Sequence, residues 1–262
     1  MHSLGWSVLF STQEVRTDIP TNVLRRRIQR ISDYLKVETV NGHQLCRVGA
    51  KADGGYVMVD NFLNIDGVLS LGVGPDVSWD DDISQFVKVI HLYDHSVEKL
   101  PKPIANATWF KEKIVTRYDS TGTSLETAVS RLLKSDRLIL KCDIEDAEWA
   151  IIAEADEELL KKFDQIVIEF HWMINHLNSD SFTTMLNALE KISSTHKVVN
   201  IHANNYANYE IVANCPIPDV IEVSYARKSS YSFIEKTLVP DFNVKNYSEH
   251  PEISLQFPLI GQ

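Results

Sequence analysis

The chain has 262 residues, a length that suits one α/β domain with extensions. Hydrophobic residues make up 44% of it and charged residues 24%, a composition typical of soluble globular proteins that excludes a largely disordered chain. Lys and Arg number 26 against 36 Asp and Glu, so the formal net charge is -10. Because such an acidic protein repels a phosphate backbone, nucleic acid is not expected as a partner.

Cysteine usage and hydropathy predict a cytoplasmic protein. Cys46, Cys142 and Cys215 are too few and too scattered for a disulfide framework, and they lack the CxxC spacing of a structural zinc site. The apolar stretch in residues 1–10 has neither a basic segment before it nor a clear cleavage site after it. No window approaches the roughly 20 apolar residues that a membrane span requires.

The N-terminal part predicts an arm, a helix and a hairpin. Residues 1–20 are expected to be irregular, and residues 21–36 predict a helix with one apolar stripe. That stripe consists of Leu24, Ile28, Ile31 and Leu35. In residues 47–60 the turn Asp53-Gly54-Gly55 separates two short strand-like runs, which predicts a hairpin. Adjacent glycines also allow the backbone to approach a ligand closely, but taken alone they are better explained by a bare turn.

From residue 67 to residue 227, apolar runs alternate with helical segments, which predicts a parallel sheet covered on both faces. The runs are 68–73, 88–94, 113–118, 137–144, 165–172, 197–203 and 220–226. The segment 203–220 is rich in Asn and Pro without a helical period, so the last two strands are expected to form an antiparallel hairpin at the sheet edge. We therefore predict an α/β, Rossmann-like fold with a seven-stranded, mostly parallel sheet and an antiparallel last strand.

Four helical segments are expected between these strands. Ser78 can cap a helix with aspartates in its first turn, and Thr123 with Glu126 forms a capping-box pattern. Residues 147–160 and 182–194 also predict helices. The tail from residue 228 to 262 contains three prolines and is expected to be an irregular extension, with apolar residues that suit docking or a homodimer contact.

The segment Gly72-Val73-Gly74 follows a buried strand and precedes a helix, which favours a ligand site at this turn. Asp94 ends the next strand, where an acidic side chain can accept hydrogen bonds from both ribose hydroxyls of an adenosine. A structural turn is the alternative. Because the pattern is GxGxD rather than GxGxxG, and no Tyr-x-x-x-Lys pair is present, it favours S-adenosylmethionine over a nicotinamide dinucleotide.

Acidic and histidine side chains follow the ends of the later strands. Asp143 ends the fourth strand and precedes Glu145 and Asp146. Capping of the next helix explains these carboxylates in part, whereas a functional Asp143 would orient an acceptor hydroxyl or hold a divalent cation. His171 and His202 follow the fifth and sixth strands. A lone strand histidine is usually structural, but two at neighbouring strand ends favour a general base that deprotonates a hydroxyl.

Seven segments, taken in order, resemble the FkbM-type S-adenosylmethionine-dependent methyltransferases over residues 47–227. They are GAKADGGYVM, SLGVGPDVSWDDD, LYDHSV, LKCDIEDAEWAII, IVIEFHW, IHANNYA and PDVIEVSYAR. The family usually has glycine where this chain has Asp146. The resemblance implies methyl transfer to oxygen on a small or glycan-type acceptor, such as a sugar, a nucleotide sugar or a polysaccharide unit, with S-adenosylhomocysteine as a product.

The resemblance also assigns residues to the cofactor. Gly72, Gly74, Asp76 and Ser78 would line its methionine end, Asp94 and His95 its ribose, and the segment Asp53, Gly54, Gly55 and Tyr56 would close over it. Residues 1–66 would then cap the site, 67–227 would form the core and 228–262 an extension. Two alternatives stay open: a nicotinamide-dependent sugar oxidoreductase or epimerase, and a non-catalytic adenosine-binding module.

Overall fold

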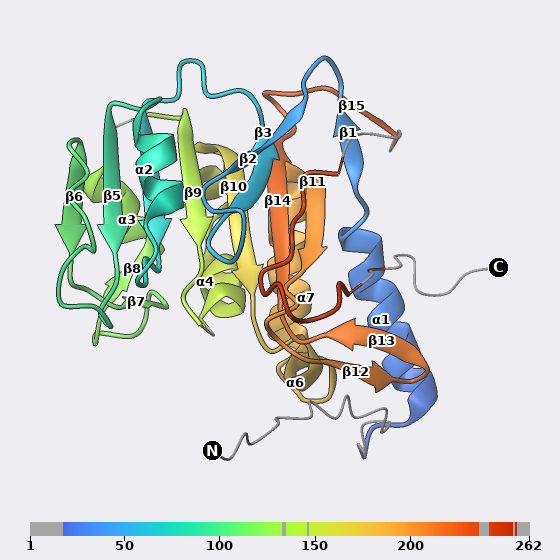
Figure 1. The fold of residues 1–262 in the computed structure, drawn as a ribbon. Coiled ribbons are helices and arrows are strands. Elements are labelled where there is room, and N and C mark those ends of the chain that lie inside the picture. Colours follow the sequence, from blue (N-terminus) through green and yellow to red (C-terminus); the bar gives the residue numbers. More distant parts are fainter. Residues whose placement is uncertain (1–17, 133–134, 146, 236–240, 254, 256–262) are drawn as a thin grey trace, which may run out of the picture.

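A seven-stranded sheet with the order β11-β14-β10-β9-β4-β5-β6 forms the centre of the protein (Figure 1). The computed structural model describes residues 18–132, 135–145, 147–235, 241–253 and 255. The sheet strands are β4 (Gly67–Leu71), β5 (Val89–Tyr93), β6 (Ala107–Phe110), β9 (Leu138–Cys142), β10 (Phe163–Phe170), β11 (His196–Ala203) and β14 (Ile221–Arg227). Within this sheet only β14 runs antiparallel to its neighbours, β10 and β11. This arrangement confirms the predicted Rossmann-like α/β fold.

Both faces of the sheet are covered, as its apolar strands require. Every residue of β4, β9 and β10 is buried. Alternate residues point to opposite faces: Leu138 and Leu140 join one apolar cluster, whereas Ile139 joins another. The first cluster includes helices α1 (Thr21–Tyr34), α3 (Leu125–Arg131), α4 (Glu148–Glu154) and α7 (Phe182–Thr195), and the second includes α2 (Ser78–Ser84).

The N-terminal helix and hairpin form as predicted. All four residues of the apolar stripe of α1 are at most 3% exposed. Strands β2 (Leu45–Val48) and β3 (Tyr56–Val59) pair antiparallel around a turn in which Gly54 has a φ of +80°. All of β3 is buried, and it contacts β14, β10 and β11. Figure 1 shows the hairpin crossing this part of the sheet. The hairpin thus lies over the sheet rather than beside it.

One predicted strand is wrong. Residues 113–118 contribute only β7 (Ile114–Val115), which pairs with β8 (Thr123–Ser124) outside the central sheet. The third strand of the parallel half is β6, which the apolar pattern missed because it lies at the sheet edge and no residue of it is fully buried.

Two predicted helix caps are also wrong. Ser124, not Thr123, caps α3, and its hydroxyl accepts a hydrogen bond from the Thr127 N–H at 3.3 Å. Glu126 pairs with Arg117 instead of closing a capping box. Ser78 is the first helical residue of α2, not its cap, and its hydroxyl accepts a hydrogen bond from the Ala50 N–H at 2.8 Å. In both cases the side chain that the local pattern assigned to the helix end interacts instead with a residue outside the helix, Glu126 with Arg117 and Ser78 with Ala50.

The chain after residue 147 is more broken than predicted. The expected helix 147–160 divides into α4 and α5 (Glu157–Leu160), because Ala155 adopts an extended conformation with ψ 138°. A further short helix, α6 (Met173–Leu177), follows β10. The segment 203–220 forms the hairpin β12 (Tyr209–Val212) and β13 (Cys215–Pro218), which the sequence did not predict.

The chain returns to its N-terminal side after the sheet. β15 (Phe233–Glu235) pairs antiparallel with β1 (Glu38–Val40). β14 lies between β10 and β11, so the predicted antiparallel pairing of the last two strands holds with β11 at the edge. Residues 1–17 of the predicted arm (1–20) lie outside the described residues, as do several apolar positions of the tail. In the described part of the chain, no helix has the length and apolarity to cross a membrane.

His196 makes the stability of the fold depend on pH. Its ring is fully buried, and its nitrogens lie 2.7 Å from the Thr195 hydroxyl and 2.9 Å from the Phe163 carbonyl oxygen. Burial lowers the pKa of His196 from 6.5 to about 4, although the Phe163 carbonyl partly opposes this. As the pH falls, His196 is therefore protonated near pH 6.5 in the unfolded chain but only near pH 4 in the folded protein. Protonation of the unfolded chain favours unfolding, so the free energy of unfolding decreases as the pH falls from about 6.5 toward 4.

We expect this coupling to cost about 3 kcal/mol of unfolding free energy between pH 7 and pH 4. The measurement is urea unfolding of the natural protein and of His196→Gln at several pH values. The Gln side chain keeps a donor for the Phe163 carbonyl but does not titrate. The stability advantage of the natural protein over the variant should shrink by that amount at low pH. An advantage that is independent of pH would contradict the prediction.

Candidate functional site

The glycine turn after β4 is held in shape by Asp94, at the end of β5. Gly72 and Gly74 have φ of +77° and +61°. One carboxylate oxygen of Asp94 accepts hydrogen bonds from the N–H groups of Val73 and Gly74, at 3.0 and 2.9 Å. The other accepts from the N–H and hydroxyl of Ser96, at 2.6 and 2.7 Å. Burial raises the pKa of Asp94, but these hydrogen bonds outweigh it and hold the pKa below its usual value.

The loop of the β2–β3 hairpin meets the start of α2 beside this turn. The Gly49 N–H donates to Asp82 at 2.9 Å, in addition to the bond between Ala50 and Ser78. Asp76 accepts a hydrogen bond from the Ser78 N–H at 2.6 Å, and a Cβ added to Gly54 would lie 3.6 Å from the Asp76 side chain. The structure therefore brings together three predicted cofactor residues: Gly54, Asp76 and Ser78. His95 directly follows Asp94 and is exposed.

Asp143 and His171 lie together at the ends of β9 and β10. The Nδ1 atom of His171 is 3.0 Å from a carboxylate oxygen of Glu148, which is fully buried. The Nε2 atom faces Glu145 at 3.5 Å, Glu169 at 3.8 Å and Asp143 at 4.0 Å. Burial lowers the pKa of His171, but the hydrogen bond to Glu148 and the surrounding carboxylates raise it to about 9. Asp146 lies outside the described residues.

Tyr56 joins the hairpin to this acidic group. Its hydroxyl oxygen is 3.0 Å from one oxygen of Asp143 and 3.0 Å from one oxygen of Glu169. A phenol carries one proton, so both contacts are hydrogen bonds only if one carboxyl is protonated. Burial and the charge of Asp143 raise the pKa of Glu169 well above its usual value. The Tyr56 hydroxyl thus connects the hairpin to both carboxyl groups, Asp143 and Glu169.

His202 lies in a second group, apart from the contacts of Asp143. Its ring nitrogens are 3.2 Å from Glu222 and 2.6 Å from Glu252. The side-chain amide of Asn204 donates to Glu169 at 2.7 Å and to Asp53 at 3.2 Å. That of Asn246 donates to Asp53 and Glu222. Asp53, one of the hairpin residues predicted for the cofactor, is therefore hydrogen-bonded to Asn204 at the sheet edge and to Asn246 in the C-terminal extension.

Sequence reasoning missed several residues of these groups, among them Lys141, Glu222 and Asn246. Lys141 is 4% exposed, donates to the Gly72 carbonyl at 2.5 Å and lies 3.9 Å from Asp143. A charged residue inside the apolar run of β9 was the available signal for it. Glu222 is likewise a charged residue inside the apolar run of β14, whereas Asn246 lies in an irregular segment that has no hydrophobic pattern.

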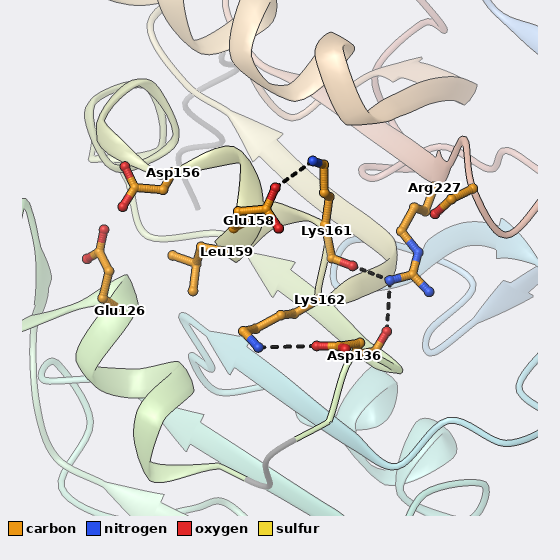
Figure 2. Close-up of a pocket in the computed structure, with 9 residues that line it drawn as sticks. Glu126, Asp136, Asp156, Glu158, Leu159, Lys161, Lys162 and Arg227 are labelled. Atoms are coloured by element: carbon orange, nitrogen blue, oxygen red, sulfur yellow. Dashed lines mark hydrogen bonds and ion pairs between the residues drawn. The ribbon is translucent and has the colours of Figure 1, made fainter.

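A cavity of about 570 Å³ lies at the opposite end of the sheet (Figure 2). In its wall, Asp136 lies two residues before β9, Lys162 directly precedes β10, and Arg227 is the last residue of the antiparallel β14. Ligands of open α/β sheets bind at the carboxyl ends of the parallel strands. Figure 2 also shows charged groups paired with one another, Lys161 with Glu158 and Lys162 with Asp136. We therefore place the candidate site at the glycine turn and not in this cavity.

Comparison with known proteins finds similar folds only. No protein-family model matches the chain, and no curated protein matches it by sequence. Fibrillarin in its complex with Nop5p is 16% identical with a TM-score of 0.39, over 62% of this chain and 73% of that one. An rRNA methylase from Streptococcus thermophilus is 9% identical with a TM-score of 0.39, over 63% and 89%.

The N-methyltransferase NodS from Bradyrhizobium japonicum, in complex with S-adenosyl-L-homocysteine, is 8% identical with a TM-score of 0.35, over 80% of this chain and 89% of that one. Several similar structures are thus described as methyltransferases. Likeness at this level concerns the fold, and the activity has to be argued from the residues of the site.

Proposed function

We propose that the chain is an S-adenosylmethionine-dependent methyltransferase that acts on a hydroxyl of a small or glycan-type acceptor. The observation that carries the proposal is the position of the glycine turn and Asp94 at the carboxyl ends of β4 and β5, next to Asp143 at the end of β9. In this proposal Gly72 and Gly74 lie against the methionine end of the cofactor. Asp94 acts on its ribose side, through a contact with the ribose hydroxyls or through the glycine turn that it holds. The resemblance in the sequence supplies the acceptor class.

Space at the turn supports a ligand there. Among the described residues, a Cβ added to Gly74 would meet no atom within 4 Å apart from its chain neighbours, although the nearby Val73 and Val77 are both 4% exposed. The hairpin with Asp53 and Tyr56 would cap the site, within the proposed division into a cap (1–66), a core (67–227) and an extension (228–262). Gly74 thus lies where a cofactor can contact the backbone.

In the proposed reaction the acceptor oxygen attacks the sulfonium methyl group in line. The new O–C bond forms as the C–S bond breaks, its electron pair stays on sulfur, and the hydroxyl proton leaves to the protein. Alignment of the two reactants can supply roughly 7–11 kcal/mol. Asp143 with His171 forms the acceptor end of the site, and removal of the proton there would add roughly 10²–10⁴-fold.

The structure gives the two histidines that were predicted as candidate bases different surroundings. His171 lies at Asp143, whereas both ring nitrogens of His202 are engaged by Glu222 and Glu252. We therefore propose His171 as the histidine of the acceptor end. His202 would instead connect the sheet edge to the extension that contains Glu252.

Calorimetric titration with S-adenosylhomocysteine, with NAD as the control ligand, tests the proposal. We expect micromolar binding of S-adenosylhomocysteine and none of NAD. Gly74→Ala should weaken this binding at least about tenfold, because its methyl group enters the proposed ligand space. Asp60→Asn, an exposed position away from the turn, serves as the matched control.

Binding of NAD alone would overturn the proposal and favour an oxidoreductase. Binding of S-adenosylhomocysteine without methyl transfer in a broad screen of sugars and nucleotide sugars would favour the non-catalytic adenosine-binding module. Transfer only to amine acceptors would retain the methyltransferase and reject oxygen as the acceptor atom.

A further inference from the structure

We infer that Asp143, Glu145 and His171 bind a divalent cation of the Mn²⁺ class. One potential ligand atom from each of these residues lies within 4.8 Å of the other two. The His171 Nε2 atom is 3.5 Å from Glu145 and 4.0 Å from Asp143. Two ligands that each bind an ion at about 2.1 Å can be at most about 4.2 Å apart, so both distances fit ligands of one ion.

The orientation of His171 is an independent observation that points to a ligand. The side chain of His171 is 8% exposed, and among the described residues its Nε2 atom makes no hydrogen bond while it faces the carboxylates. Its other nitrogen is fixed by Glu148, whose side chain is 0% exposed. A buried carboxylate that orients a histidine in this way is the usual outer partner of a metal-bound imidazole.

The second carboxylate group offers a contrast. Asp53, Glu169 and Glu222 also lie close enough together to hold an ion. However, the amide N–H groups of Asn204 and Asn246 point at these carboxylates and satisfy them. At the Asp143 group, the Tyr56 hydroxyl and the Lys141 ammonium face one carboxylate oxygen of Asp143, Oδ2. The other oxygen, Oδ1, faces the Nε2 atom of His171, which offers a lone pair to a metal once its proton is displaced. We therefore assign the cation to the Asp143 group alone.

The chemistry of the donors decides the class of ion. One imidazole nitrogen and two carboxylates suit Mn²⁺ or another first-row ion better than Ca²⁺, which prefers oxygen ligands alone. Glu145 is 79% exposed, so the ion is reached directly from solvent. The role of the ion would be to orient the acceptor hydroxyl and to lower the pKa of that hydroxyl. This role rests on the proposed function. With the ion bound, His171 acts as a ligand rather than as the proton acceptor, and the hydroxyl proton passes to solvent water instead of to the protein.

Titration of the full chain with Mn²⁺, followed by electron paramagnetic resonance, tests the site. We expect one equivalent of Mn²⁺ to bind at submillimolar concentration, with a nitrogen coupling in the spin-echo spectrum from His171. Glu145→Gln should weaken Mn²⁺ binding at least about tenfold without affecting folding, since the side chain is exposed. Glu157→Gln, an exposed carboxylate in the first turn of α5, should leave Mn²⁺ binding unchanged.

Absence of Mn²⁺ binding, equal affinity in Glu145→Gln, or a bound ion without nitrogen coupling would each overturn the inference. Titration with S-adenosylhomocysteine separates this failure from failure of the proposed function. If the cofactor product binds and Mn²⁺ does not, only the metal site is rejected. If Mn²⁺ binds through Glu145 and the cofactor product does not, the metal site stands and the proposed function is rejected.

Discussion

Gly72→Ala is expected to lower the free energy of unfolding by about 3–5 kcal/mol, the largest stability effect that we predict for a single methyl group. Gly72 has a φ of +77°, where an L-residue is strained, and an added Cβ would lie 1.5 Å from the Asp143 carbonyl oxygen. That oxygen belongs to backbone whose own N–H donates to the Leu71 carbonyl at 2.9 Å. Relief of the clash would therefore require the ends of β4 and β9 to separate.

Gly74→Ala is the matched control for this prediction. Gly74 also has a positive φ, of +61°, but within 4 Å its added Cβ would meet no atom of the described residues other than its chain neighbours. The variant should lose only the conformational cost of about 1–2 kcal/mol. Urea unfolding of both variants, with the slopes compared to confirm two-state behaviour, measures the difference. Equal losses would show that the approach of β4 to Asp143 is not rigid.

The central strands could be predicted because burial on both faces leaves a continuous apolar run in the sequence. β4, β9 and β10 each give such a run, and the turn after β4 is marked by two glycines in the positions that need positive φ. The half-exposed edge strand β6 gives no such run, so the third strand was placed wrongly. The sequence pattern therefore located the parallel core and lost accuracy toward the edge of the sheet.

The sequence predicted which strand ends form the site, but not the hydrogen bonds that join the site to distant segments of the chain. The ends of parallel strands meet at one edge of a sheet, so Asp94, Asp143 and His171 could be grouped from the sequence. Tyr56 was assigned to the cofactor, yet its hydroxyl reaches Asp143 and Glu169 from a hairpin 87 and 113 residues away in the chain. Asn246 reaches Asp53 across 193 residues. Such contacts depend on how the hairpin and the extension pack on the sheet, and no local pattern encodes them.

Asp94→Asn is expected to weaken the binding of S-adenosylhomocysteine roughly 100-fold under the proposed function. The natural carboxylate accepts four hydrogen bonds, two from the glycine turn and two from Ser96. An amide has one acceptor oxygen, so its NH₂ group would face N–H or O–H donors on one side. Loss of charge-assisted bonds costs about 1.5–3 kcal/mol each, and the turn would no longer be held in its bound shape.

A 2′-deoxyribose analogue of S-adenosylhomocysteine shows which role of Asp94 dominates. If the carboxylate contacts the ribose, removal of the 2′-hydroxyl should weaken binding to the natural protein much more than binding to Asp94→Asn, because the two changes then remove the same interaction. If Asp94 acts only through the turn, both proteins should lose the same factor. The four hydrogen bonds already made by the carboxylate favour the second result, since a carboxylate offers about four lone-pair sites. Asp94 would then hold the cofactor by holding the backbone that contacts it.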